Sequence, residues 1–174
     1  MENLLNALGQ FKDKKVIVVG DVMLDMYIMG TGGRPNPESL EALMIDDVNI
    51  DYRLGGAGNV ANNVVSLGAS CYLLGQIGND ALREEIVKLC KKKGIESYFA
   101  VDPDKETIFK LRMFVDGRYV IRANIGEKDL HPMDYEKGAE LEAGLIKEID
   151  SCNLVIFSDY NKGVFRGGLA KRLI

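Results

Sequence analysis

The hydrophobic pattern of the chain alternates short apolar runs with longer segments of helical periodicity. Continuous apolar runs of this kind are typical of parallel strands that are buried on both faces of a sheet. They cover residues 16–19, 72–74 and 154–157. Amphipathic helical spacing covers residues 59–67, 80–93 and 134–149. This alternation predicts an α/β fold: an open, doubly wound, mostly parallel sheet with right-handed crossovers.

Two regions depart from this alternation. Residues 24–30 with 40–54, and residues 107–125, have the pattern of antiparallel strands, and Asp116-Gly117 is a typical two-residue hairpin turn. Together they predict a small antiparallel sheet that projects from the main one. Residues 166–174 begin a further helical pattern.

The turn at Asp116-Gly117 also gives an expected register for its hairpin. Counting outward from the turn places Arg112 with Lys110 on one face, and Arg122 with Arg118 on the other. Only one of these basic pairs would then look into a site beneath the sheet. The alternative is that both pairs form a solvated surface of little energetic consequence.

Composition and charge narrow the class of protein. The chain has a formal net charge of -4 with scattered Lys and Arg, which argues against nucleic acid as the main partner. It has no long uncharged apolar run, so no membrane span is expected, and residues 1–15 lack the apolar core of a signal peptide. Three cysteines without paired spacing favour the cytoplasm. His131 is the only histidine, so a His-rich metal site is excluded and no metal ligand is assigned.

The most informative segment is residues 55–61, Gly-Gly-Ala-Gly-Asn-Val-Ala, at the start of a predicted helix. Gly55 and Gly56 permit positive φ and let the main chain approach a ligand that a Cβ would repel. Asn59 offers two donors and an acceptor at the beginning of the helix, where it is also placed to cap. This combination suits a polyhydroxylated ligand.

The same segment also fits the Gly-x-Gly-x-x-Ala form of a dinucleotide-binding fingerprint. That fingerprint must follow a buried strand and precede, by about twenty residues, an acidic residue for the ribose. Residues 51–54 make a poor central strand, and the next strand ends in Gln76-Ile77-Gly78, so neither condition is met. A Walker A lysine is also missing. Dinucleotide binding is therefore disfavoured.

Taken together, these motifs resemble the first signature of the ribokinase-like carbohydrate kinases, the phosphofructokinase-B family. After the glycine pair its elements follow in order, namely Asn59, Ala61, Gly68 and Gly78. Further segments look like the heptose-7-phosphate kinases, the kinase half of the bacterial bifunctional enzymes of ADP-heptose synthesis. They are Val18–Asp25, Arg34 with Pro37-Glu38, and Ser158–Val164. The resemblance runs from about Lys14 to the last residue.

The resemblance implies a transferase that moves the γ-phosphoryl group of ATP to a sugar hydroxyl. The substrate it implies is D-glycero-D-manno-heptose 7-phosphate, which becomes the 1,7-bisphosphate on the route to ADP-heptose and lipopolysaccharide. A magnesium ion is expected with it, bound mainly through the nucleotide phosphates. The projecting sheet would be a lid over the sugar and, as in several family members, the contact of a homodimer.

A ribokinase-like domain is about 300 residues long, near the limit for a single hydrophobic core. Residues 1–174 are therefore expected to be the N-terminal part of one kinase domain. The general base and most of the ATP site are expected in a C-terminal half that this chain does not include. The chain alone is then expected to be inactive.

Further candidate substrate-binding residues follow two of the predicted strands. Asp25 lies just beyond the first, at the carboxyl edge where open α/β sheets bind ligands, and its carboxylate can accept bonds from vicinal hydroxyls. Asp159 and Lys162 follow the third strand at the same edge, where the resemblance implies sugar contacts. A phosphate needs a cationic partner, preferably a guanidinium, and by resemblance this is Arg112 or Arg122. Without the resemblance, Asp25 is expected to cap a helix or turn, and Asp159 and Lys162 are expected to form a surface ion pair of little energetic value.

A second hypothesis, from another class, is a non-catalytic sugar-binding or interaction module of the same fold. Met26, Gly32-Gly33 and residues 34–39 depart from the heptose-kinase pattern. A ribokinase-like kinase for another sugar is therefore a further alternative. Sugar binding without ATP turnover would favour the module.

Overall fold

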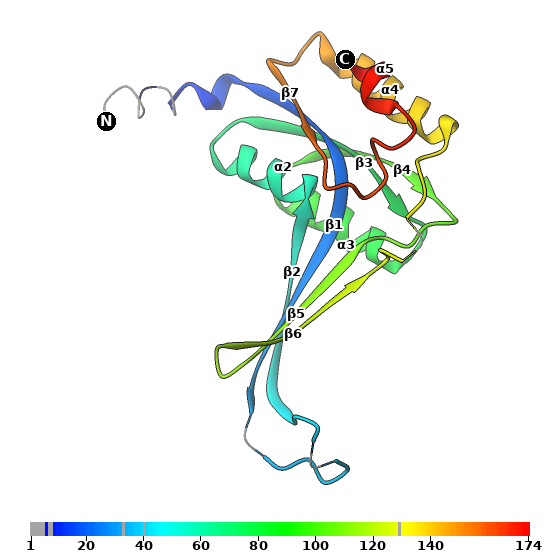
Figure 1. Ribbon diagram of the computed structural model, residues 1–174. Coiled ribbons are helices and arrows are strands. Elements are labelled where there is room, and N and C mark those ends of the chain that lie inside the picture. The colour runs from blue at the N-terminus through cyan, green and yellow to red at the C-terminus, as the bar shows by residue number, and fades with distance from the viewer. Residues whose placement is uncertain (1–5, 7–8, 33, 40, 129) are drawn as a thin grey trace.

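Figure 1 shows the computed structural model of the chain, which describes residues 6, 9–32, 34–39, 41–128 and 130–174. One sheet forms its centre. The strands are β1 (Lys15–Gly32), β2 (Ile45–Gly56), β3 (Ser70–Gly78), β4 (Glu96–Asp102), β5 (Phe109–Val115), β6 (Arg118–Ile125) and β7 (Leu154–Ser158). The helices are α2 (Ala57–Ser66), α3 (Ala81–Lys92), α4 (Tyr135–Ile149) and α5 (Leu169–Leu173), with a 3-10 turn, η1, at Phe11–Asp13.

The sheet is organised around β1, whose two halves have different neighbours. The first half pairs in parallel with β3 and β7, and β3 pairs in parallel with β4. The second half pairs antiparallel with β2 and parallel with β5, which in turn pairs antiparallel with β6. The predicted α/β class and its mostly parallel sheet are confirmed.

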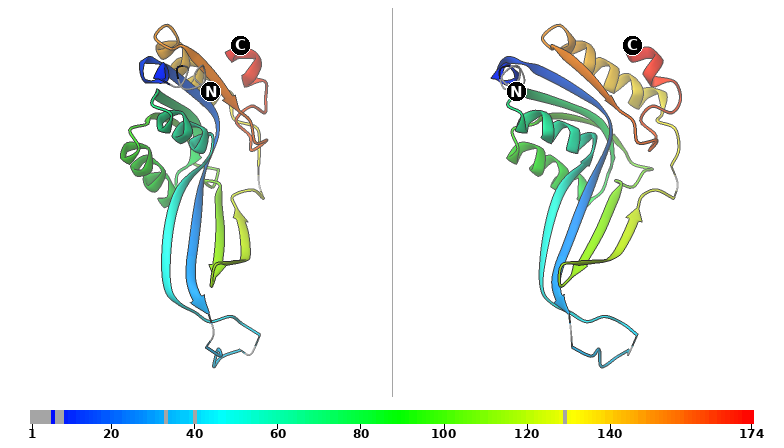
Figure 2. Two further views of the ribbon diagram at one scale, coloured as in Figure 1. Left: turned by 90° about the vertical axis from the view of Figure 1, so that its left-hand side faces the viewer. Right: turned by 60° about the vertical axis from the view of Figure 1, so that its left-hand side comes forward.

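Helices cover both faces of the main sheet, α2 and α3 on one side and α4 and α5 on the other (Figure 2). Side chains of β1 alternate between these two layers. Val16 and Val18 pack with α2 and α3, whereas Ile17 and Val19 pack with α4 and α5. A strand covered on both faces has no polar side, which explains its continuous apolar run. Among the described residues, no helix is long and apolar enough to span a membrane.

The second half of β1 leaves the main sheet together with β2, β5 and β6 (Figure 1). We call this extension the projecting sheet; it comprises residues 22–32, 45–56, 109–115 and 118–125. Both predicted antiparallel pairs are confirmed. The strand predicted over 40–54 begins at Ile45, while residue 40 itself, like Gly33, lies outside the described residues.

The β5–β6 hairpin confirms the predicted turn but corrects the register. Asp116 and Gly117 form the turn with φ values of 49° and 74°, as a two-residue hairpin loop requires. A bulge then shifts the pairing between Met113 and Phe114, so that Arg112 lies directly opposite Arg122. The prediction that these arginines lie on opposite faces is wrong, because one extra residue in a strand turns every later side chain over.

Two helix starts also differ from their predictions. α2 begins at Ala57 instead of Asn59, so Asn59 is inside its first turn and makes no capping bond. Gly56, with φ of 56°, stands at the N-cap. α5 begins at Leu169 because Gly167 and Gly168 have positive φ and interrupt the helical pattern that starts at residue 166.

Candidate functional site

The candidate site lies where the projecting sheet leaves the main sheet. Asp25 is at this junction, and its register partners are Arg53 of β2 and Lys110 of β5. Register partners have their side chains on the same face, so these three groups share one face. The expectation that Asp25 follows the end of a strand is wrong, because β2 and β5 extend the pairing of β1 to Gly32. Asp25 nevertheless lies just past the segment that pairs with β3, which ends at Asp21.

Asp25 forms an ion pair with Arg112. Oδ1 of the carboxylate lies 2.7 Å from Nη1 of the guanidinium, and both side chains are partly buried. Neither of these two atoms has a well-aligned hydrogen-bond partner in the part of the chain that the structure describes. Charged groups in contact but without aligned hydrogen bonds keep the capacity to bind a polar ligand.

Tyr27 orients two guanidinium groups on this face. Cζ of Arg53 lies 4.3 Å from the centre of the tyrosine ring, and Cζ of Arg112 lies 5.3 Å from it. Such cation–π contacts hold a guanidinium at a fixed height above the sheet while its donors remain free to reach a ligand.

Arg122 adds a second guanidinium directly across the hairpin from Arg112. It is exposed, and its Nε donates to Oδ1 of Asn124 at 3.2 Å. Directly opposite residues of an antiparallel pair are the closest side-chain neighbours in a sheet, and like charges there are unfavourable. An anion between the two guanidinium groups would remove that repulsion.

Glu127 is a second carboxylate in this region. Its Oε2 forms an ion pair with Nζ of Lys162 at 3.0 Å, and its Oε1 lies 4.0 Å from Nζ of Lys110. Burial lowers the pKa of Lys110, and the carboxylates of Glu127 and Asp25 oppose that shift. Sequence reasoning missed Glu127 because it follows the hairpin in a loop and belongs to no motif.

The two predicted glycines make room beside Asp25. A Cβ on Gly55 would lie 2.8 Å from Cγ of Met23 and 3.1 Å from the carboxylate of Asp25. Gly56 has positive φ, and a Cβ there would meet the backbone oxygen of Asp21. Both positions therefore require glycine, because the protein itself packs closely around them. The close approach of the main chain to a ligand stays a prediction.

Asn59 lies apart from this cluster. It is exposed on the first turn of α2, where it lines a hollow of about 220 Å³ together with Asp51, Arg53 and Asn62. Arg53 links this hollow to the site because it is also the register partner of Asp25. The contact of Asn59 with a sugar stays a prediction.

The loop after β7 brings Lys162, but not Asp159, to the other charged groups. Asp159 is exposed, and its Oδ1 accepts the backbone N–H of Asn161 at 2.7 Å, which is a local turn. Lys162 pairs with Glu127, and not with Asp159 as a simple surface pair would require. Behind the loop, the buried carboxylate of Asp21 accepts hydrogen bonds from several backbone N–H groups of the loop, and sequence reasoning missed this role.

The described residues hold no group of three His, Cys, Asp or Glu side chains that is arranged to bind a metal ion. The carboxylates of the site, Asp25 and Glu127, are each engaged by basic side chains. These residues do not fit a protein-built magnesium cage, so no chemical step is routed through one.

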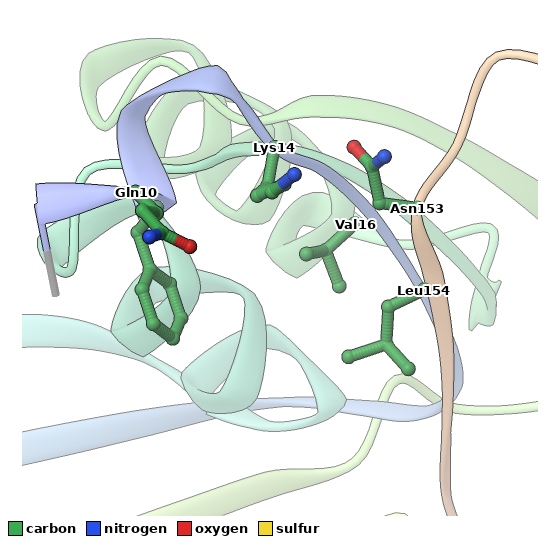
Figure 3. A pocket seen from close by; sticks show the side chains of 6 residues that line it. Gln10, Lys14, Val16, Asn153 and Leu154 are labelled. Carbon is green, nitrogen blue, oxygen red and sulfur yellow. The ribbon is translucent and has the colours of Figure 1, made fainter. Parts of the chain in front are cut away.

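A separate apolar hollow lies at the other edge of the main sheet (Figure 3). It has a volume of about 550 Å³ and is lined by Phe11, Val16 and Leu154, with Gln10, Lys14 and Asn153. These residues stand at the amino ends of β1 and β7. Ligands of open α/β sheets bind at the carboxyl ends of the strands, so this hollow is not the candidate site.

An open α/β sheet, with carboxylates, glycines and basic side chains at the base of a projecting sheet, is typical of the class of proteins that bind small polar ligands at the carboxyl edge of the sheet. The particular family follows from comparison with known proteins. The chain belongs to the pfkB family of carbohydrate kinases, whose family model matches residues 13–159.

The chain is also similar in sequence to individual curated proteins. The chain is 37% identical over 159 residues to the bifunctional protein HldE of Shewanella amazonensis, covering 90% of this chain and 32% of that protein. It is 33% identical over 162 residues to HldE of Rhodospirillum rubrum, covering 92% of this chain and 32% of the relative. The chain thus spans about a third of the length of the curated relatives it matches.

Solved structures share the fold. Phosphofructokinase-2 from Escherichia coli, in its tetrameric inhibited form, matches with a TM-score of 0.61 at 17% identity, covering 87% of this chain and 47% of that one. A carbohydrate kinase from Agrobacterium tumefaciens matches with a TM-score of 0.57 at 19% identity, covering 83% and 45%.

Proposed function

We propose that the complete protein is a sugar-phosphate kinase that transfers the γ-phosphoryl group of ATP to a sugar hydroxyl. The substrate we propose is D-glycero-D-manno-heptose 7-phosphate, phosphorylated at its anomeric hydroxyl. The observation that carries the proposal is the placement of Arg112 opposite Arg122 and in contact with Asp25. This arrangement provides adjoining places for a phosphate and for hydroxyl groups.

The hydroxyl side of the site is Asp25 with Gly55. A carboxylate accepts two hydrogen bonds from vicinal hydroxyls, and glycine at position 55 lets the main chain of β2 pack against that carboxylate, where a Cβ would lie 3.1 Å from it. On ligand binding, sugar hydroxyls would take over Oδ1 of Asp25, which lacks a well-aligned hydrogen-bond partner among the described residues. Asn59, Gly56 and Asp159 are proposed as further contacts of the sugar.

The phosphate side is formed by basic groups. Arg112 and Arg122 offer planar donors that suit phosphate oxygens, and Lys110 lies on the same face. Lys162 reaches this region through Glu127. A dianionic phosphate placed among these cations would compensate their mutual repulsion, which gives selectivity for a phosphorylated sugar over the free sugar.

The particular sugar rests on the resemblance of the chain's motifs to the heptose-7-phosphate kinases. The curated relatives are named bifunctional protein HldE, which is consistent with a kinase that forms part of a larger protein. ATP as phosphoryl donor and magnesium as its counter-ion are part of the proposal. Catalysis would rest on positioning and charge stabilisation, with the general base contributed from outside this chain.

Isothermal titration of the full-length protein tests the proposal. We expect heptose 7-phosphate to bind at least about 100-fold more tightly than the unphosphorylated heptose, because charged hydrogen bonds to phosphate are lost with it. Equal binding of the two sugars would refute the phosphate site. Fructose 6-phosphate serves as the competing sugar, and its tighter binding would indicate a kinase for another sugar. Sugar-phosphate binding without any ATP turnover would indicate the non-catalytic module.

We also propose that the protein forms a homodimer through the projecting sheet. The face opposite Arg112 and Arg122 is apolar and carries Ile50 and Ile121, each 49% exposed. Exposed apolar patches of this kind mark protein contacts. One form of the related phosphofructokinase-2 is tetrameric. Ile121→Lys should give a monomer in sedimentation experiments, whereas Val87→Lys on α3, a matched exposed site, should not; an unchanged mass for Ile121→Lys would contradict this contact.

A further inference from the structure

The loop between β7 and α5 carries Lys162 between two residues with positive φ. Asn161 has φ of 58° and Gly163 has φ of 117°. Asn and Gly are the residues that adopt this conformation most readily, so the chain can turn on both sides of Lys162. Contacts to the backbone of Lys162 then set the direction in which its side chain leaves the loop.

Asp21 holds the N–H side of this loop. Its Oδ2 accepts the backbone N–H groups of Tyr160 at 2.8 Å and Lys162 at 3.0 Å, and its Oδ1 accepts that of Val164 at 3.1 Å. Asp21 is only 1% exposed and lies on β1, at the last position paired with β3. A buried carboxylate that accepts several backbone N–H groups makes strong, charge-assisted bonds.

Lys105 holds the carbonyl side of the same residue, Lys162. Its Nζ donates to the backbone oxygen of Lys162 at 3.1 Å and to Oε1 of Gln76 at 3.0 Å. Gln76 is itself fixed, because its Nε2 donates to Oδ2 of Asp102 at 2.8 Å. Lys105 is 8% exposed, so its ammonium group is committed to this network and does not serve as a solvated surface charge.

The two charges thus hold the backbone of one residue from both sides. The N–H of Lys162 donates to the Asp21 carboxylate, and its carbonyl oxygen accepts from the Lys105 ammonium. The loop packs closely at the next position, where a Cβ on Gly163 would lie 2.9 Å from the backbone oxygen of His131 and 3.4 Å from Nζ of Lys105. The side chain of Lys162 leaves the loop from this fixed backbone and reaches Glu127.

We propose that Lys105 is a positioning residue for substrate binding, which acts through Lys162. By fixing the Lys162 peptide against Asp21, it aims the Lys162 side chain at Glu127 and the base of the projecting sheet. Lys105 itself does not touch the ligand. This inference rests on the proposed sugar-phosphate function of the site, and its test separates the two.

The first measurement is hydrogen exchange of the backbone amides in the full-length protein. Lys105→Met should speed exchange of the amides at 160, 162 and 164 by about 10-fold or more, since a charged hydrogen bond to the loop is lost. The amides of α2 and β3 should keep their rates. Lys91→Met, an exposed lysine on α3, is the matched control and should change neither.

The second measurement is a double-mutant cycle on the affinity for heptose 7-phosphate. Lys105→Met and Lys162→Met should each weaken binding by about 10-fold or more, and the double variant should bind about as weakly as Lys162→Met alone. Lys162→Met should leave the loop amide rates unchanged. If Lys105→Met acted only through a general loss of stability, its loss in affinity would instead multiply with that of Lys162→Met in the double variant.

Lys105→Gln keeps a polar partner for Gln76 and serves as the second variant if Lys105→Met does not fold. Unchanged loop exchange in a folded Lys105 variant would overturn the positioning role. So would losses in affinity that multiply in the double variant. If the wild-type protein binds no heptose 7-phosphate, the proposed function fails, while the exchange rates still decide whether Lys105 holds the loop.

Discussion

The two halves of β1 belong to one continuous strand but have opposite surroundings. Residues 16–24 are all buried, with a helical layer over each face of most of this segment. Residues 25–32 are part of the projecting sheet, and none of them is buried. Asp25 is the first residue after the change. The comparison shows how a rigid strand can carry a charged group to the edge of the core, where the charge keeps water or ligand as a partner.

The difference in burial between the two halves of β1 can be tested by replacing one isoleucine in each half with alanine. Ile17→Ala should lower the free energy of unfolding by about 2–5 kcal/mol, because it leaves a cavity in a fully buried layer. Ile28→Ala, in the half-buried second half, should cost about 1 kcal/mol or less. Denaturant unfolding at constant m-value measures both. Equal losses at the two positions would mean that the halves do not differ in burial as described.

The charged residue at the boundary should matter for binding and not for stability. Asp25→Ala should weaken heptose 7-phosphate binding by about 100-fold, since it removes the hydroxyl acceptor and leaves Arg112 without its partner. Glu85→Ala, which removes the surface partner of Lys88 on α3, is the control and should change affinity by about 3-fold at most. Titration calorimetry would decide, and an equal effect of the two changes would place the sugar elsewhere.

The close packing beside Asp25 can be disturbed by one added methyl group. Gly55→Ala should weaken sugar-phosphate binding by about 10-fold, because its Cβ would crowd Met23 and the Asp25 carboxylate. Gly9→Ala is the matched control, since a Cβ there meets nothing within 4 Å. If Gly55→Ala binds like the wild-type protein in the same titration, the ligand does not approach this part of the main chain.

The smallest effect concerns pH. The second pKa of a phosphate monoester is about 6, so affinity should rise as the pH increases from about 5 to 7 and the ligand gains charge. Lys110 binds phosphate only when protonated, and burial lowers its pKa below 10.5, so affinity should fall again on the alkaline side before an ordinary lysine would lose its proton. Lys110→Arg should remove this alkaline fall. An alkaline limb that persists in Lys110→Arg would assign it to another group.

Much of the main sheet was predictable from local pattern. The apolar runs at 16–19, 72–74 and 154–157 lie in β1, β3 and β7, and the helical segments correspond to α2, α3 and α4. The prediction that the third run is buried on both faces is wrong, because Leu154 and Phe157 of β7 are exposed. Burial on two faces leaves a continuous apolar run, and burial on one side of a helix leaves a period of 3.6, so both can be read without knowing the partner. The turn at Asp116-Gly117 was predictable for the same reason.

The site was predictable only in part. Asp25, Gly55 and Gly56 lie together, and Arg112 and Lys162 are directed to the same region. The shared face of Arg112 and Arg122 was not predictable, because it depends on a bulge in β6 that no residue type in the hairpin predicts. Asn59 remains a predicted contact that shares a hollow with Arg53, and Asp159 remains one whose carboxylate closes a local turn.

The sequence by itself determined which segments are strands and helices, where the chain turns tightly, and which family the glycine-rich signature resembles. Only the tertiary structure decided that Glu127 pairs with Lys162, and that Asp21 and Lys105 hold the loop that carries Lys162. The physical reason is distance along the chain. Local pattern records whether a residue is buried, whereas the partner of a charge is set by loops and strand ends that lie far apart in sequence and meet only at the carboxyl edge of the folded sheet.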